Sequence, residues 1–108
     1  MDKFSSMLGL CRRAGNLAVG RDAVLAAVRK NQTDVVFLTA DASPRHAREL
    51  RAVSPDLAIT ALSLPMEAFA PVLGKKSCLF APLDPNFASA LLKLSNEIIF
   101  EEPNDITE

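Results

Sequence analysis

The sequence predicts one α/β domain, built as a three-layer α/β/α sandwich. Short apolar runs alternate with segments whose apolar residues recur every three or four positions, in the order α-β-α-β-α-β-α-β-α. The run DVVFLTA is almost continuously β-branched or aromatic, which is typical of a strand that is covered on both faces. We therefore expect helices on both sides of the sheet.

Two helices and a strand are predicted in the first 30 residues. The first helix has one apolar face that stops before Gly15; this face consists of Phe4, Met7, Leu8, Cys11 and Ala14. Residues 17–19 are apolar and predict a short strand. A second helix is predicted at residues 21–30, with basic residues near its carboxyl end, where the helix dipole favours them.

Two cap signals place further helices. Ser43 followed by Pro44 is typical of an N-cap and a first helical position, so a helix is expected from there to about residue 53. Asp84 and Pro85 repeat this signal before the last helix.

Three strands and one helix fill the intervals. Strands are predicted at residues 34–40, 57–64 and 77–81, and we expect the second of them to be a buried strand like the first. A helix is predicted at residues 66–73. We expect this helix to be bent, because Pro71 removes a hydrogen bond from its interior.

Length and charge divide the chain into a domain and a tail. The 108 residues fit one compact domain, which we assign to residues 1–96. Residues 97–108 contain five acidic residues and no basic one, and we interpret them as an acidic tail. Within the tail, the apolar residues 98–100 are expected to pair as an edge strand. The first 51 residues carry nine basic and five acidic residues, a balance of +4, although the whole chain has a net charge of -1.

The composition argues against a membrane or secreted protein. Apolar residues make up 49% of the chain but fall in short clusters, not in the roughly 20-residue run that crosses a bilayer. The two arginines near the amino end follow the apolar part, the reverse of a secretory signal. We therefore expect a soluble, cytoplasmic protein.

No pattern of residues predicts an enzyme, a metal site or a cofactor. The chain lacks a nucleophile elbow, a phosphate-binding loop, a dinucleotide fingerprint and a zinc-binding helix motif. Cys11 and Cys78 lack metal-ligand spacing, and we expect both to be buried small hydrophobic residues. His46 has no nucleophile near it in the sequence and is expected to be a surface or packing residue.

Gly20 is the strongest local candidate for a binding site. It lies between a strand and a helix whose first amide groups lack intrahelical partners, a position that suits a phosphate. Asp22 falls in the first turn, where its carboxylate could satisfy the same amides and repel an anion. The residues alone leave open whether Gly20 binds a phosphate or only makes a tight turn.

From Lys3 to Leu94 the chain resembles the ribosomal-protein family L seven Ae and its L thirty e relatives, in particular their small bacterial YlxQ-like branch. The matching segments are LGLCRRAGNLAVGRDAVLAAVR, VVFLTADAS and LGKKSCLFAPLDPNFASALLKL. The resemblance implies a four-stranded mixed sheet between helices. It also implies non-catalytic binding of kink-turn or related structured RNA.

The resemblance implies that Gly20 and the residues after it contact RNA. Asp22 stands where kink-turn binders have Asn. Ala23 and Ala26 replace the family's Glu and Lys, so two side chains that would contact a base and a phosphate are missing. This departure puts kink-turn specificity in question.

The resemblance also implies a second contact in the loop after the third strand, residues 62–65. Here Leu64 and Pro65 offer apolar atoms for stacking on an unpaired base, although Leu62 as a core residue and Pro65 as a helix start is an equally open interpretation. The basic residues expected near this edge are Arg12, Arg13 and Arg21, with Lys75 and Lys76 after the fourth helix. Arg45, Arg48 and Arg51 are expected to form a separate solvated face.

These observations predict a non-catalytic, ribosomal-protein-like RNA-binding protein of translation that recognises structured, kink-turn-like RNA. Ribosomal RNA or the ribosome is a candidate partner, and a monomer is expected. A protein-interaction module that has lost RNA binding is the alternative, favoured by Ala23, Ala26 and the acidic tail. A small-molecule enzyme that uses the surface at Gly20 is a third hypothesis.

Overall fold

The computed structural model describes residues 2–99, and of the last four of these only the backbone is described. Its elements follow the predicted alternation of helices and strands. The helices are α1 (Lys3–Arg13), α2 (Arg21–Arg29), α3 (Pro44–Val53), α4 (Met66–Leu73) and α5 (Pro85–Ile99), and the strands are β1 (Leu17–Val19), β2 (Val35–Leu38), β3 (Ala58–Ala61) and β4 (Leu79–Pro82). No helix within residues 2–99 has the length and apolarity that a membrane crossing needs.

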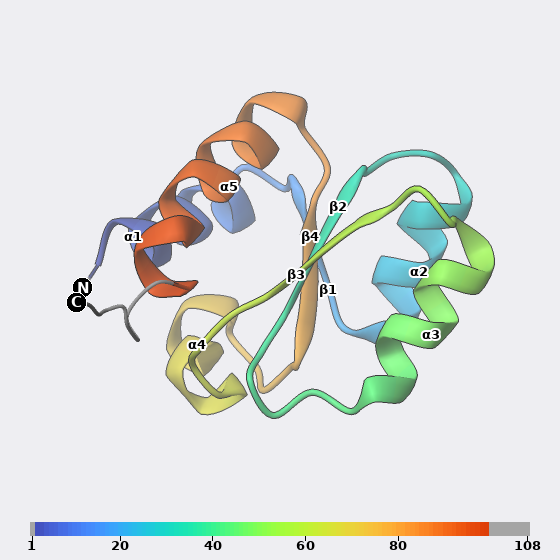
Figure 1. Cartoon of the computed structure of the whole chain (residues 1–108). Coiled ribbons are helices and arrows are strands. Elements are labelled where there is room, and N and C mark those ends of the chain that lie inside the picture. Colours follow the sequence, from blue (N-terminus) through green and yellow to red (C-terminus); the bar gives the residue numbers. More distant parts are fainter. Residues whose placement is uncertain (1, 100–108) are drawn as a thin grey trace.

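The strands form one mixed sheet in the order β1-β4-β2-β3. β2 and β3 are parallel, whereas β4 is antiparallel to both of its neighbours, β1 and β2. Figure 1 shows the sheet almost edge-on, with α2 and α3 on one side and α1, α4 and α5 on the other. The predicted three-layer α/β/α sandwich with a four-stranded mixed sheet is confirmed.

The central strands are apolar throughout because each of their faces meets a different helical layer. In β2, Val35 and Phe37 belong to the core cluster that contains residues of α1, α4 and α5, while Val36 and Leu38 belong to the cluster with α2 and α3. In β4, Phe80 joins the first cluster and its neighbours Leu79 and Ala81 join the second. The alternation of side chains along a strand thus turns a continuous apolar run into two hydrophobic cores.

Four phenylalanines hold the first core together. Phe4 of α1, Phe37 of β2, Phe69 of α4 and Phe80 of β4 are each at most 1% exposed. Each ring contacts two of the others, with centroid distances of 5.5 to 5.9 Å, and the two contacts of Phe4 are edge-to-face. Such pairs add stability beyond the burial of apolar area, and here they join two helices to the two central strands.

The third strand is not buried, contrary to our expectation for residues 57–64. β3 lies at the edge of the sheet and pairs only with β2; its two alanines are exposed, and the residues between them are half-buried. The buried residues of this segment are Leu57 and Leu62, which flank the strand and are 5% and 3% exposed. The apolar run therefore arises from buried residues at the two ends of an edge strand, and it does not mark a central strand.

The expected edge strand at residues 98–100 is also wrong where the structure describes it. α5 includes Ile98 and Ile99, because the helical spacing of apolar residues that begins after Pro85 continues through them. Phe100 and the rest of the tail lie outside the described residues.

The helix with the internal proline is short: α4 ends two residues after Pro71 and is followed by Gly74 with a φ of 80°.

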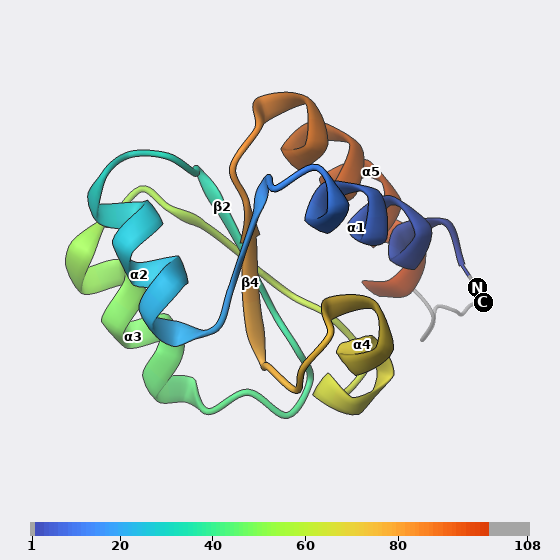
Figure 2. The same cartoon turned by 180° about the vertical axis from the view of Figure 1, so that it is seen from behind.

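One end of the sheet gathers four segments that are distant in the sequence. Because β4 runs against the other strands, its first residue lies at the same end as the last residues of β1, β2 and β3. In Figure 2, β1 leads to the start of α2 at this end. Three backbone hydrogen bonds link the segments: Gly20 N to Leu79 O (3.0 Å), Thr39 N to Cys78 O (2.9 Å) and Ala40 N to Leu64 O (2.8 Å). We call it the Gly20 end of the sheet.

Asp41 fixes two loops at the Gly20 end. Its Oδ1 accepts hydrogen bonds from the Thr39 hydroxyl (2.7 Å) and from the backbone amide of Met66 (3.0 Å). These bonds, the Thr39 bond first, hold the pKa of Asp41 below its usual value. The carboxylate thus attaches the loop after β2 to the loop at residues 62–65.

Phe37→Ala should lower the free energy of unfolding by about 3–5 kcal/mol, because it leaves a cavity among the four phenylalanines. Chemical denaturation followed by circular dichroism measures this loss. Leu92→Ala is the control: Leu92 is 37% exposed, so the change should cost only about 0.5 kcal/mol. Equal losses for the two variants would contradict the assigned core.

Asp41→Ala should lower the melting temperature at pH 7, and the difference from the unmodified protein should shrink as the pH falls. The folded pKa of Asp41 lies below its unfolded value of about 3.9, so its stabilisation is present above that value and is lost as the pH falls through the folded pKa. Thermal melts between pH 2 and 7 test this sign. A loss of melting temperature that stays the same from pH 2 to 7 would contradict the role of the two Asp41 hydrogen bonds.

Candidate functional site

The start of α2 at the Gly20 end has backbone amides that no side chain caps. Gly20 has a φ of 96° and a ψ of 162°, which an L side chain rarely adopts, and α2 has no side-chain hydrogen bond at its N-cap. Asp22 does not satisfy these amides, contrary to the sequence-based alternative. Its side chain is 96% exposed and pairs with Arg21 at 3.1 Å. The first amides of α2 therefore face outward with the positive end of the helix dipole.

Lys75 places an ammonium group beside Gly20. A β-carbon built on Gly20 would lie 3.5 Å from the Lys75 Nζ. The lysine and the first turn of α2 line the same shallow hollow. Lys75 makes no ion pair with a carboxylate of the described residues. The dipole of α2 and an unneutralised cation thus act at one point of the surface.

Arg12 extends this positive surface from α1. Gly74 has a φ of 80°, and a β-carbon on it would lie only 2.5 Å from Nη2 of Arg12, so the guanidinium rests against the backbone of Gly74. Gly74 precedes Lys75, which connects Arg12 to Gly20 through two adjacent residues. Arg13, the next residue of α1, is exposed like Arg12, and neither forms an ion pair within residues 2–95. We call Arg12, Arg13 and Lys75 the cationic rim.

Arg21, which we expected to act with Arg12 and Arg13, is neutralised by carboxylates. Its Nε and Nη2 donate to the two carboxylate oxygens of Glu49 on α3, at 3.1 and 2.8 Å, and its Nη1 pairs with Asp22. These hydrogen bonds raise the pKa of Arg21 and lower the pKa of Glu49. Arg21 therefore joins α2 to α3, and a phosphate would have to compete with Glu49 for it. Sequence reasoning missed this pair because its members are 28 positions apart.

The loop at residues 62–65 divides into a buried and an accessible part. Leu62 is a core residue, 3% exposed, as one of the two sequence interpretations had it. Leu64 is half-buried against the first core, and Pro65 is exposed at the N-cap position of α4. This loop follows the edge strand opposite to β1, so it lies three strand spacings, about 14 Å, from the strand that carries Gly20.

Small side chains flank the start of α2. Ala23 is exposed and Ala26 is half-buried, so the helix offers only backbone groups and methyl groups at these positions. The exposed arginines of α3, Arg45, Arg48 and Arg51, lie on the layer of α2 and α3. Lys76, next to Lys75, lies 3.8 Å from a carboxylate oxygen of Glu67.

The two cysteines differ in their surroundings. Cys11 is fully buried, as predicted, and its thiol donates to the Asn16 carbonyl (3.1 Å); burial raises its pKa to about 11. Cys78 is only half-buried, contrary to expectation, and its Sγ lies 3.4 Å from Nε2 of His46, a contact between residues 32 positions apart that could not be expected from the sequence. His46 is a packing residue whose Nδ1 is buried and has no hydrogen-bond partner among the described residues. Among the described residues no three His, Cys, Asp or Glu side chains are grouped as metal ligands.

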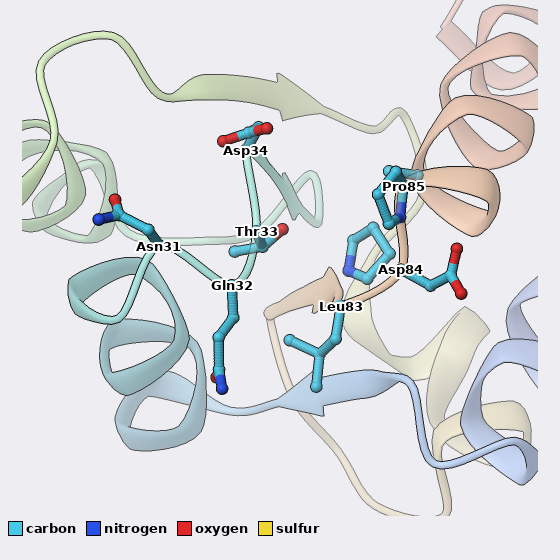
Figure 3. A pocket seen from close by; sticks show the side chains of 9 residues that line it. Asn31, Gln32, Thr33, Asp34, Leu83, Asp84 and Pro85 are labelled. Carbon is cyan, nitrogen blue, oxygen red and sulfur yellow. The ribbon is translucent and has the colours of Figure 1, made fainter.

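The opposite end of the sheet has a different character. Figure 3 shows a pocket there, lined by the segments 31–34 and 82–85. The Thr33 hydroxyl donates to the Val35 carbonyl (3.0 Å), and Asp84 accepts from the amide of Asn86 (2.7 Å). Its charged residues are Asp34 and Asp84, both acidic. The cationic rim and this pocket therefore carry charges of opposite sign.

No family model matches the chain, but individual proteins do. The chain is 28% identical over 93 residues to the RNA-binding protein YlxQ of Enterococcus faecium, covering 85% of this chain and 90% of that protein. Among solved structures, a protein of unknown function from Bacillus halodurans superposes with a TM-score of 0.78 at 25% identity, over 89% of this chain and 99% of that one.

A second solved structure shares the fold at low sequence identity. The 15.5-kDa RNA-binding protein of Giardia lamblia matches with a TM-score of 0.66 and 11% identity, over 87% of this chain and 82% of its own. The same layers therefore accommodate very different sequences. Along most of its length the chain is therefore similar to a YlxQ protein, and it has the fold of the L seven Ae family, as the resemblance implied.

Proposed function

We propose that the protein binds structured RNA at the Gly20 end of the sheet and catalyses no reaction. The observation that carries this proposal is the cationic rim beside the uncapped start of α2. Arg12, Arg13 and Lys75 come from two separate segments and have no carboxylate partner in the described structure. The relative of this chain that is named an RNA-binding protein supports the same function.

The rim suits contacts to the RNA backbone. Lys75 and the first amides of α2 converge on one place, where a phosphate oxygen can accept from both. Arg12 and Arg13 would bind further phosphates along the same strand. Contacts of this kind set affinity and orientation without distinguishing one base from another.

Base recognition would fall to the loop at residues 62–65. Leu64 and Pro65 offer apolar surface on which an unpaired base can stack, across the end of the sheet from Gly20. Ala23 cannot hydrogen-bond a base edge. We therefore propose recognition of RNA shape, with kink-turn-like or ribosomal RNA as the candidates, by a cytoplasmic monomer that acts in translation.

A protein-interaction module that has lost RNA binding is the second candidate. The Arg21–Glu49 pair favours it, because one of the expected phosphate ligands is already neutralised within the protein. Binding assays with a kink-turn hairpin, bulk transfer RNA and total ribosomal RNA separate the two functions. Failure of all three RNAs to bind at low salt would favour the interaction module.

Lys75→Gln should weaken binding of a kink-turn hairpin about tenfold, because it removes one charge-assisted contact. It should also reduce the slope of log affinity against log salt by about 0.7 to 0.9, the contribution of one neutralised phosphate. Arg12→Gln should act similarly. Fluorescence anisotropy titrations at several salt concentrations measure both quantities.

Arg48→Gln is the matched control for these variants. It removes the same charge from α3, away from the cationic rim, and should leave the affinity and the salt slope nearly unchanged. Arg21→Gln should reduce the slope less than Lys75→Gln, because Glu49 already neutralises Arg21. Equal effects of all four variants would show that only net charge matters, which would refute the proposed interface.

Gly74→Ala should weaken RNA binding without changing any charge. The new methyl group would occupy the place of the Arg12 guanidinium and displace it from the rim. Gly15→Ala is the control, because Gly15 has a similar φ of 75° but no atom within 4 Å of the added carbon. Both variants should lose about 1 kcal/mol of stability from backbone strain, and only Gly74→Ala should lose RNA affinity. Equal RNA affinities of the two variants would argue against the role of Arg12.

A further inference from the structure

A groove between α1 and α4 lies beside the cationic rim. It has a volume of about 430 Å³, and Leu10, Pro71 and Val72 give it apolar walls. Leu10 is 49% exposed, more than any other large hydrophobic residue of the described chain. Arg12 and Arg13 line the same groove. It therefore combines an apolar surface with two cations that have no carboxylate partner in the described structure.

This combination suits a peptide segment with an apolar side chain next to carboxylates. An RNA strand would use the arginines but would leave the surface of Leu10, Pro71 and Val72 without an apolar partner. A purely apolar segment would bury the two guanidinium groups without compensation. The segment that fits has an aromatic or aliphatic residue followed directly by acidic ones.

The chain itself contains such a segment after Ile99, the last residue of α5. Residues 100–108 read FEEPNDITE, with Phe100 directly before Glu101 and Glu102. The segment has four acidic residues and no basic one, so its charge is opposite to that of Arg12 and Arg13. Its order of apolar and acidic residues matches the order that the groove requires.

The segment is long enough to reach the groove. α5 packs against α1, and Leu94, near its end, contacts the core cluster that contains Phe4 of α1 and Phe69 of α4. In Figures 1 and 2 the end of α5 lies on the side of the molecule where α1 begins. The contacts fall to the first three residues of the segment, which span up to about 10 Å when extended. The guanidinium of Arg13 lies back along α1 toward them, because its Nη1 is 3.5 Å from a β-carbon built on Gly9, about 6 Å along the helix axis from Ser5.

We propose that residues 100–108 bind in the groove between α1 and α4. Phe100 contacts the apolar surface of Leu10, and Glu101 and Glu102 pair with Arg12 and Arg13. Exposed ion pairs of this kind are weak and screened by salt, but a covalent tether supplies a high effective concentration. If the proposed function holds, the segment and RNA compete for the two arginines, and this consequence rests on that function.

Paramagnetic broadening in the full-length chain tests the contact without RNA. A spin label on Asn104→Cys, with Cys78→Ser and the buried Cys11 unchanged, should broaden the amide signals of Gly9, Leu10 and Val72. The amides of Gln32 and Asp34, at the opposite end of the sheet, should stay sharp. Broadening should decrease as salt rises. Uniform broadening, or none at the groove, would overturn the proposal.

A charge exchange identifies the partners. Arg12→Glu with Arg13→Glu should abolish the broadening, and adding Glu101→Arg with Glu102→Arg should restore it. Arg48→Glu with Arg51→Glu on α3 is the control and should leave it unchanged. As a last check, spin-labelled protein with observable amides is diluted into protein that carries neither label. Broadening that then disappears would come from a second copy in the groove, which would also overturn the proposal.

A separate RNA titration tests the competition. Glu101→Gln with Glu102→Gln should strengthen binding of a kink-turn hairpin several-fold at low salt. Asp105→Asn with Glu108→Gln makes the same change in net charge outside the proposed pairs and should have a smaller effect. Groove broadening in a protein that binds no RNA would mean that the proposed function fails while the contact stands. RNA binding without broadening would mean that the contact fails while the proposed function stands.

Discussion

The position of β4 in the sheet is the constraint on which the candidate site depends. β4 lies between β1 and β2 and runs against both, so it begins at the Gly20 end, where β3 has ended. The connection from β3 through α4 to β4 therefore brings Gly74 and Lys75 to the start of α2 and within reach of the Arg12 side chain. Two contacts follow from it, Lys75 beside Gly20 and Arg12 against Gly74. A β4 parallel to its neighbours would have begun at the opposite end, near Asp34.

The burial of β2 and β4 on both faces makes this arrangement rigid. Each strand contributes alternate side chains to two separate cores. A shift of the strand by one residue would therefore move the side chains of each core into the other. Phe37 and Phe80 stack across the two strands, and Phe4 and Phe69 join them to α1 and α4. The helices that carry Arg12 and end at Gly74 are thus positioned by the same cluster that fixes the strands.

The layered fold could be predicted from the sequence, because continuous apolar runs, helical periodicity and the signals at Ser43 and Asp84 are local properties. The exposure of β3 could not be predicted, since an edge strand and a central strand differ only in their neighbours.

Of the candidate site, Gly20 could be predicted from its place before a helix. The partners of the cations could not be predicted, because Glu49 meets Arg21 and Lys75 meets Gly20 only after the layers have packed. A count of basic residues therefore overestimates the positive charge that Arg21 offers to a ligand and does not show that Lys75 lies at the site.

The distribution of partners explains how a chain with a net charge of -1 can present a positive surface. Glu49 and Asp22 neutralise Arg21 within the domain, and acidic residues line the pocket at the far end of the sheet. Arg12, Arg13 and Lys75 have no carboxylate partner in the described part, and Lys75 lies next to the uncapped amides of α2. By the family resemblance, a kink-turn binder would have Glu and Lys on the second helix, where this chain has Ala23 and Ala26. The residues of its cationic rim are instead on α1 and in the turn before β4. In the proposed function, such a surface would determine where an RNA backbone lies more strongly than which bases it carries.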